Sequence, residues 1–315
     1  VSIRGFNLNG HNMYLNGIQG MLDQQHAADI YIDKATVIAG PNLGIVGTPN
    51  RENLGGTILF TSKKAQAEPN LDLTLAYQGG KSFKEAVDFG TRLGHNQRWG
   101  IRVMADNIQG ETAIDGDKLT QRDFFVNIDQ KTKKSKTNLL IGYNYADQKG
   151  AQFTWNFNEY NQPKGSRLPK APDNGRSYLP EWTNNEYDNW IATLNHEQIL
   201  SDHTTAFFNA GYHREDWYGY QYGTPRLQNA NGDYTVHPEN YPLAVTTKYF
   251  GGGIKGKFNL GSTKHNYVLS ADRMMYDNYG GTNKKWGNNG EILLRGNMYT
   301  CLLYTSPSPR DISGS

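Results

Sequence analysis

The stretch GPNLGIVGTPNRENLGGTILFTSKK, residues Gly40–Lys64, separates two kinds of sequence. Its first part is rich in glycine, proline and asparagine, which favours turns. Its second part contains the apolar run Thr57–Phe60, which predicts a strand, and the preceding pair Gly55 and Gly56 suits positive φ or a close approach of another backbone. An ordinary loop and hairpin would also explain these residues alone. Because one repeated pattern begins only after this stretch, we interpret it as a hinge between two structures.

The repeated pattern is an alternation of apolar and polar residues with a period of two, which predicts strands with one apolar and one polar face. The apolar positions are Leu71, Leu73, Leu75 and Tyr77; Val87, Phe89 and Leu93; Trp99, Ile101 and Val103; Phe124, Val126 and Ile128; and Leu139, Ile141, Tyr143 and Tyr145. Further strands are expected at about 187–200, 203–215, 245–258, 263–277 and 291–300. The pattern therefore predicts an all-β chain with about ten strands.

The connections between these strands differ in length at the two ends of the predicted sheet. Short turns near 94–96, 132–134, 201–202 and 259–262 alternate with longer segments at about 108–119, 148–186, 216–244 and 278–290, apart from a short connection near 78–82. Tight turns at one end and long loops at the other, with strands of about ten residues, are typical of a transmembrane β-barrel. A soluble β-sandwich or propeller is the alternative, although its strands are usually shorter.

Composition narrows the classes of protein. The 315 residues carry a net charge of +2, which gives no support to nucleic-acid binding. Mean hydropathy is −0.72, and no apolar run is long enough for a spanning helix. The chain has one cysteine, which excludes a disulfide framework within it.

No motif in the chain indicates catalysis, a cofactor or a bound metal. The glycines of a G-x-G-x-x-G pattern at 251–256 lie inside a predicted strand, whereas a dinucleotide fingerprint needs a strand-to-helix turn. The eight histidines include no H-x-x-x-H pair. Acidic residues of the loop near 148–186 could hydrolyse a glycoside in principle, but solvated acidic loops are common. We therefore expect no enzyme, no cofactor and no metal site.

Four motifs in order carry a resemblance to a known family: SIRGF at Ser2–Phe6, YLNGI at Tyr14–Ile18, IDKATVIAGP at Ile32–Pro41, and the opening stretch. Together they resemble the C-terminal part of the plug domain of TonB-dependent outer-membrane receptors. The motifs NRENLGG and YLNGI are most similar to those of the siderophore receptors of that family. Two positions depart from the pattern, Ala39 in place of an arginine and Val46 in place of an aromatic residue.

The resemblance implies three segments: 1–65 as the C-terminal part of a plug, 70–300 as the N-terminal part of a β-barrel, and 301–315 as a tail that is similar to translated adapter read-through. Lys63 or Lys64 would mark the boundary between plug and barrel. Barrels of this class have about twenty-two strands, and the chain starts at Val1 with no signal peptide. We therefore expect a fragment of a longer receptor.

The resemblance also implies active import across the outer membrane of a Gram-negative bacterium, with ferric siderophores as the expected ligands. The expected partners are the TonB-ExbB-ExbD energy-transducing complex and outer-membrane lipid. Alternatives that stay open are a carbohydrate or cobalamin receptor of the same architecture, a passive porin, and a soluble all-β binding module.

Candidate ligand contacts come from two sources. The family architecture places the ligand against the apices of the plug, and rigid aromatic rings in the long loops suit aryl or sugar-like ligands. Several of these rings would serve equally well in an interfacial aromatic girdle. The candidates are Phe6, Asn7, His11, Gln19, Met21, Ile45, Val46, Trp155, Tyr160, Tyr178, Trp182, Tyr218 and Tyr220.

Overall fold

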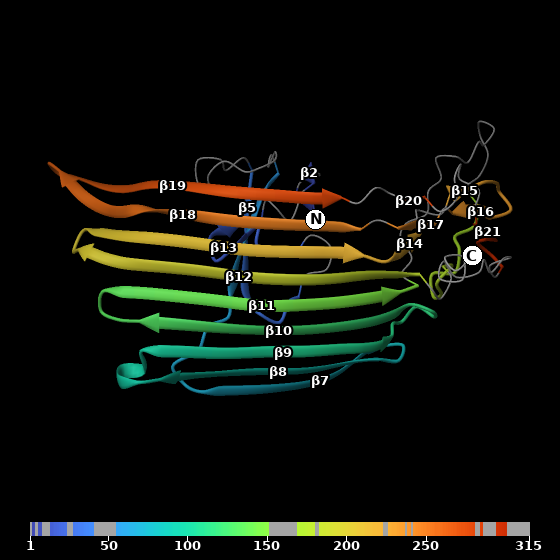
Figure 1. Ribbon diagram of the computed structural model, residues 1–315, viewed down its shortest axis with the longest axis horizontal. Helices are drawn as coiled ribbons and strands as arrows, with labels where there is room; N and C mark the ends of the chain where they lie inside the picture. The colour runs from blue at the N-terminus through green and yellow to red at the C-terminus, as the bar shows by residue number, and fades with distance from the viewer. Residues whose placement is uncertain are drawn as a thin grey trace.

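Nine long strands form a single antiparallel sheet, which we call the wall sheet (Figure 1). A computed structural model describes residues 2–3, 6–7, 13–23, 28–40, 55–150, 169–179, 183–222, 226–236, 238–240, 242–280, 284–285 and 294–300. The strands of the wall sheet are β7 (Asn70–Gly79), β8 (Ser82–Leu93), β9 (Trp99–Glu111), β10 (Lys118–Lys131), β11 (Ser135–Lys149), β12 (Asn184–Ser201), β13 (Thr204–Tyr218), β18 (Leu243–Leu260) and β19 (Thr263–Gly280). Strands that neighbour each other in this list are hydrogen-bonded.

A second sheet of four strands, the inner sheet, has the order β4-β3-β6-β5. Its strands are β3 (Tyr14–Leu15), β4 (Ile18–Gln19), β5 (Ile32–Ala39) and β6 (Gly56–Ser62). The turn between β3 and β4 has positive φ at Asn16 and Gly17, which is the backbone of a two-residue hairpin. Gly56 has φ of 134°, and a Cβ there would overlap the carbonyl of Ile38 on the paired strand. The second feature confirms the positive φ and the close approach predicted for this glycine pair.

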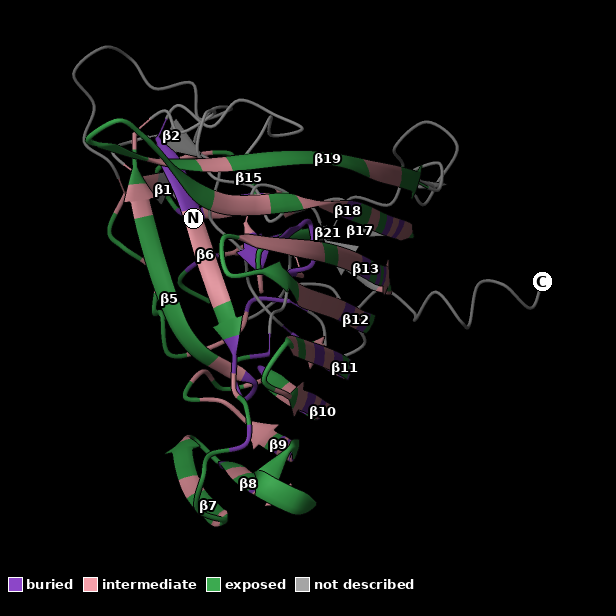
Figure 2. Cartoon of the chain, turned by 90° about the vertical axis from the view of Figure 1, so that its left-hand side faces the viewer, coloured by how far each residue is buried: buried purple, intermediate pink, exposed green. Residues whose placement is uncertain are grey.

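The inner sheet lies on the concave side of the wall sheet, as Figure 2 shows in a view onto the tight-turn end. Three small sheets complete the described strands: β1 (Ser2–Ile3) with β2 (Phe6–Asn7); β14 (Tyr220–Tyr222), β17 (Pro238–Asn240) and β20 (Lys284–Lys285); and β15 (Arg226–Leu227), β16 (Asp233–Val236) and β21 (Leu294–Asn297). The last two of these sheets lie at the long-loop end of the wall. Within the described residues, no helix is long and apolar enough to span a membrane.

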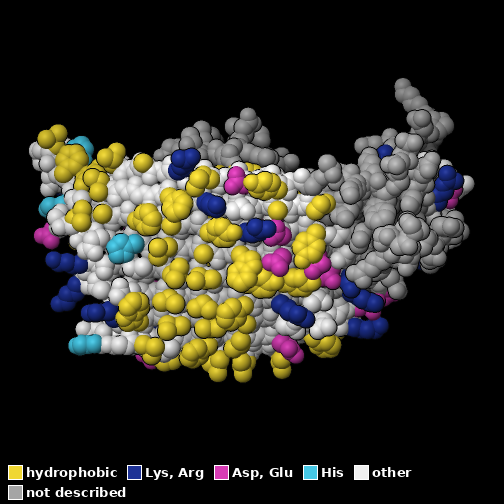
Figure 3. All heavy atoms as spheres, viewed as in Figure 1, with side chains coloured by type: hydrophobic (Ala, Val, Ile, Leu, Met, Phe, Trp, Pro, Cys, Tyr) yellow, Lys and Arg dark blue, Asp and Glu magenta, His cyan; other side chains and the backbone are white. Residues whose placement is uncertain are grey.

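The two faces of the wall sheet have opposite character, as the period of two predicts. Its outward face exposes large apolar side chains, with Leu75 85% exposed, and Figure 3 shows them as a broad patch. Its inward face is polar, and many of its side chains from β8 to β13 are buried, with Asn144 1% exposed. Apolar outside and polar inside is the arrangement of a wall that faces lipid and encloses a polar lumen.

The predicted turns and strands match the structure with two corrections. The connection predicted at about 108–119 covers only 112–117, because β9 extends to Glu111 and β10 begins at Lys118. The tight turns fall between β8 and β9, where a 3₁₀ helix covers His95–Gln97, and between β10 and β11, β12 and β13, and β18 and β19. The strand predicted at 291–300 is described only as β21, Leu294–Asn297, and it pairs with β16 instead of extending the wall. The described part of the wall therefore has nine strands. The four residues of β21 pair with β16 at the long-loop end and not with the edge strand β19.

Candidate functional site

The inner sheet is attached to the wall by buried charges at the point where the chain passes from one sheet to the other. Arg102 of β9 donates two hydrogen bonds to Asp88 of β8, from Nε at 2.6 Å and from Nη2 at 2.8 Å, and Lys63 reaches the same carboxylate at 3.0 Å. Arg102 also donates to the backbone carbonyl of Lys64 at 3.0 Å. Since each charge is paired and hydrogen-bonded, the group can remain buried. The end of the inner sheet is therefore fastened to β8 and β9.

A second ion pair repeats this arrangement one residue further along the chain. Arg92 of β8 binds the carboxylate of Asp129 on β10 at 2.8 and 3.1 Å, and also donates to the carbonyl of Ala65 at 3.1 Å. A planar guanidinium suits such a task because it can bind a carboxylate with two parallel bonds and retain a further donor. We call Lys63, Asp88, Arg102, Arg92 and Asp129 the ionic anchor.

Amide side chains form a second link, between the hairpin turn of the inner sheet and the middle of the wall. Ser62 Oγ accepts hydrogen bonds from Asn16 at 2.9 Å and from Asn127 of β10 at 3.0 Å. Asn195 of β12 donates to the carbonyl of Asn16 at 2.9 Å. The left-handed backbone at Asn16 turns both its side chain and its carbonyl towards partners.

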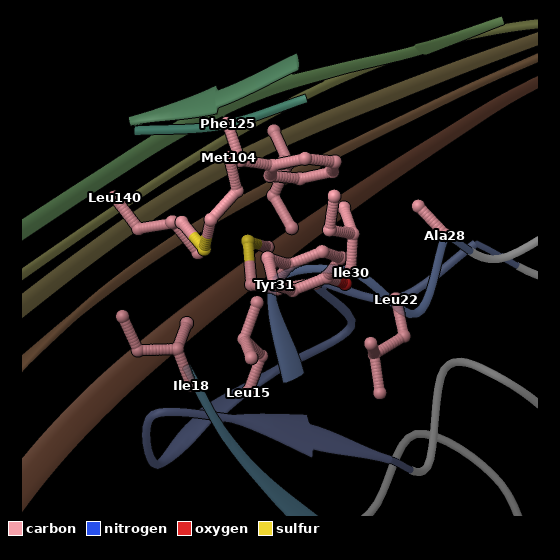
Figure 4. Packing of buried hydrophobic residues seen from close by; sticks show 11 residues of the cluster. Leu15, Ile18, Leu22, Ala28, Ile30, Tyr31, Met104, Phe125 and Leu140 are labelled. Carbon is pink, nitrogen blue, oxygen red and sulfur yellow. The ribbon is translucent and has the colours of Figure 1, made fainter. Parts of the chain in front are cut away.

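An apolar cluster fills the space between the inner sheet and strands β9 to β12 (Figure 4). Its buried members are Leu15, Ile18, Met21, Leu22, Ala28, Ile30, Tyr31, Met104, Phe125, Leu140 and Ile191. The rings of Tyr31 and Phe125 stack with centroids 4.1 Å apart, and burial raises the pKa of the Tyr31 phenol well above its ordinary value. Phe125 lies over Gly142 of the neighbouring strand, where a Cβ would collide with the ring. A glycine is therefore needed at this position for the ring to reach the inner sheet.

Two polar contacts join the segment after β4 and the segment before β5 to the wall. His213 of β13, which is buried, lies 2.8 Å from the carboxylate of Asp23. Lys84 of β8 lies 3.5 Å from Asp29 and 2.7 Å from Asp106 of β9. Since Tyr249 of β18 also packs against the buried apolar residues, contacts from the inner sheet and the segments beside it extend from β8 to β18.

The long-loop end has an ordered core of its own around Tyr178. This ring is 4% exposed, its hydroxyl donates to the carbonyl of Asp173 at 2.8 Å, and the guanidinium of Arg176 lies 4.8 Å from its centroid. Tyr234 of β16 donates to the carbonyl of Tyr178 at 3.2 Å. The described part of this loop is thus folded onto the small sheets at the same end.

The candidate ligand contacts fall into different places. Gln19 and Met21 are buried between the inner sheet and the wall, where Met21 packs against Gly211 of β13. Tyr178 lies in the loop core, and Tyr218 lies on the outward face, where its hydroxyl donates to Glu186 at 3.1 Å beside Tyr145. Phe6, Asn7 and Tyr220 lie in short strands whose backbone alone is described, and His11, Ile45, Val46, Trp155, Tyr160 and Trp182 lie outside the described residues. A ligand role for all of them stays a prediction.

The sequence reasoning missed most of the residues that link the two sheets, although one signal was present. Met104, Phe125, Leu140 and Ile191 are apolar residues at positions of the polar, inward face. Three of them lie in one row across the wall, since Phe125 pairs with Met104 on one side and with Gly142 on the other, and Gly142 pairs with Ile191. Apolar residues interrupting a polar face indicate a contact with another element.

A wall that is apolar outside and polar inside, with a four-stranded sheet held against its concave face, is a fold that solved structures of outer-membrane receptors share. The chain superposes on the ferric preacinetobactin receptor BauA of Acinetobacter baumannii with a TM-score of 0.87 and 22% identity, covering 96% of this chain and 44% of that one. The ferripyoverdine receptor of the outer membrane of Pseudomonas aeruginosa gives a TM-score of 0.74 and 15% identity, covering 91% and 39%.

A curated relative is similar in sequence as well. The chain is 27% identical to the ferrichrome receptor FcuA of Yersinia enterocolitica over 292 residues, which are 92% of this chain and 37% of the relative. The predicted resemblance to TonB-dependent siderophore receptors is confirmed, and the chain spans less than half the length of these relatives. No protein-family model matches the chain. Within the described residues, no group of three or more histidine, cysteine or acidic side chains could hold a metal ion.

Proposed function

We propose that this chain is part of a TonB-dependent receptor that imports ferric siderophores across the outer membrane of a Gram-negative bacterium. The inner sheet would be the C-terminal part of its plug, within 1–65, and the wall would be the N-terminal part of its barrel, within 70–300. The remaining segment, 301–315, lies outside the described residues. Support comes from the receptors that the chain resembles, which are named for ferrichrome, preacinetobactin and pyoverdine.

The observation that carries the proposal is the attachment of the inner sheet to the inward face of the wall. A passive pore needs an open lumen, whereas here Asp88, Arg102 and the apolar cluster hold a folded sheet against the lumen side. A solute can pass only if this contact is rearranged, and breaking paired buried charges costs several kcal/mol. An external source of work, such as the TonB-ExbB-ExbD complex, would supply that energy.

The ligand would enter from the long-loop end, which faces outward when the tight turns face the periplasm. The candidate contacts that fit this side are the aromatic residues of the long loops, including Tyr178. Outer-membrane lipid would cover the apolar outward face.

Uptake of radioactive iron tests the proposal. The full reading frame that contains this chain is expressed in a strain without siderophore receptors of its own, with and without functional TonB. We expect saturable uptake of at least one ferric siderophore that requires TonB. Uptake of a carbohydrate or of cobalamin alone would show that the substrate is not a ferric siderophore. Uptake that continues without TonB would indicate a passive pore.

A further inference from the structure

A pocket of about 570 Å³ lies between the inner sheet and the wall at the tight-turn end. Asn16 and Lys64 line it from the inner side, and Lys131 and Lys136 line it from β10 and β11, on either side of a tight turn. This volume is within the range of small-molecule sites, about 300–1,000 Å³. The pocket is on the opposite side of the inner sheet from the long loops, so it would face the periplasm in a barrel.

The pocket is lined by four lysines and two carboxylates, and both carboxylates are already engaged. Asp129 belongs to the ionic anchor, and Glu197 lies 2.5 Å from the amine of Lys255. The other three amines, those of Lys64, Lys131 and Lys136, have no hydrogen-bond or ion-pair partner within the described residues. The pocket lining therefore has an excess of lysines, four against two carboxylates.

Lys64 lies among charges of both signs in this pocket. Burial holds the pKa of Lys64 below its ordinary value, while the carboxylates of Asp129 and Glu197 offset the opposing charges of Lys131 and Lys136. A negatively charged group placed among the three amines would supply charge-assisted hydrogen bonds that these amines lack within the described residues.

We propose that this pocket is a release-side subsite for an anionic ferric chelate, of the catecholate or carboxylate type, as it leaves the wall towards the periplasm. The inference rests on the proposed import function and adds to it a charge class for the substrate. It follows from the position of the pocket, along the contact that must rearrange for passage, and from the convergence of Lys64, Lys131 and Lys136 on one cavity.

Site-resolved acylation of lysines tests the subsite directly. The receptor from its full reading frame, purified in detergent, is treated with a limiting amine-reactive reagent in the presence of the ferric complex of 2,3-dihydroxybenzoate, and each lysine is quantified by mass spectrometry. At a probe concentration about four times its Kd, we expect about fivefold slower acylation of Lys64, Lys131 and Lys136. Lys133 and Lys134 lie in the same turn, are exposed and do not line the pocket, so they should react unchanged. A neutral ferric trihydroxamate should protect none of them.

Equal protection of the turn lysines and the pocket lysines, or no protection by the anionic complex, would overturn the subsite. The matched variants are K64M/K136Q and K133Q/K134Q, which remove the same charge from the same region. We expect the first to weaken binding of the catecholate complex about tenfold, as the loss of a charge-assisted hydrogen bond predicts, and the second to leave it unchanged. Equal effects of the two variants would mean that the region attracts anions only through its overall charge, and would refute the subsite.

The two levels of the proposal fail separately. If the strain takes up a ferric chelate but the pocket lysines are never protected, the subsite is wrong and the import function stands. If no ferric chelate is taken up while the anionic complex still protects Lys64, Lys131 and Lys136, the pocket binds anions and the import function is wrong.

Discussion

The ionic anchor and the apolar cluster hold the same inner sheet to the same wall by different forces. The anchor uses few atoms in fixed directions, with Arg102 and Arg92 each bonded to a carboxylate and to a backbone carbonyl. The cluster uses many weak contacts among side chains such as Tyr31 and Phe125. The first force depends on complete pairing of every charge, whereas the second grows with the apolar area buried.

This difference determines how each region responds to change. Removing one member of the anchor leaves a buried charge without a partner, so the effect spreads to the groups that remain. Removing one member of the cluster leaves a cavity whose cost depends on how far the neighbours relax. The anchor should therefore behave as a unit, and the cluster as a sum of separate side chains.

The largest effect is expected for Asp88→Ala. This change leaves the guanidinium of Arg102 and the amine of Lys63 without their shared carboxylate, so unfolding in detergent should become easier by about 3–5 kcal/mol. Trypsin should also reach the inner sheet sooner. The matched control is Glu85→Ala on the same strand, which is exposed and should change stability by about 0.5 kcal/mol or less. Similar losses for both variants would show that the anchor has no special role.

A smaller loss, about 2–4 kcal/mol, is expected for Leu140→Ala. Leu140 is fully buried in the cluster, so the change removes apolar contacts and leaves a cavity. Its control is the adjacent Leu139→Ala, which makes the same change on the outward face, where detergent replaces the lost contacts. Urea unfolding of both variants measures the difference. Equal losses would mean that burial against the inner sheet contributes nothing beyond ordinary apolar surroundings.

The amide link should contribute less than either region. Ser62→Ala removes the oxygen that accepts hydrogen bonds from Asn16 and Asn127, and a buried donor without a partner costs about 1–3 kcal/mol. Since the side-chain amide of Asn16 also donates to Thr193 Oγ1 at 3.4 Å, we expect the lower half of that range. Thr36→Ala, at an exposed position of β5, is the control that should leave unfolding unchanged. A loss as large as that of Asp88→Ala would place the main attachment at the hairpin turn instead.

Much of the fold could be predicted because it is encoded locally. Alternation within each strand, turn residues such as Asn16 and Gly17, and the unequal connections all act over short distances along the chain, and the structure agrees with them. The exception is the segment at 291–300, where β21 pairs with β16. A strand pattern predicts an extended backbone but does not name its partner.

The candidate site was harder to predict because its contacts join distant positions. The hydrogen bond between Asn195 and Asn16 spans 179 positions, and the contact of His213 with Asp23 spans 190. Polar residues of the inward face, such as Asp88 and Arg102, look like any hydrated lumen residues in the sequence. Only the apolar residues on that face, with Phe125 as the clearest, carry a local signal that another element covers the wall.

The smallest predicted quantity is the coupling between the two regions, and it tests their independence most sharply. Asp88 and Leu140 share no partner among the contacts described, and they lie on β8 and β11 with two strands between them. If the anchor and the cluster act independently, the losses of Asp88→Ala and Leu140→Ala should add to within about 0.5 kcal/mol in the double variant. A combined loss well below the sum would mean that breaking the anchor already releases the inner sheet from the cluster. The two regions would then be one cooperative attachment, and a pull on either would open both.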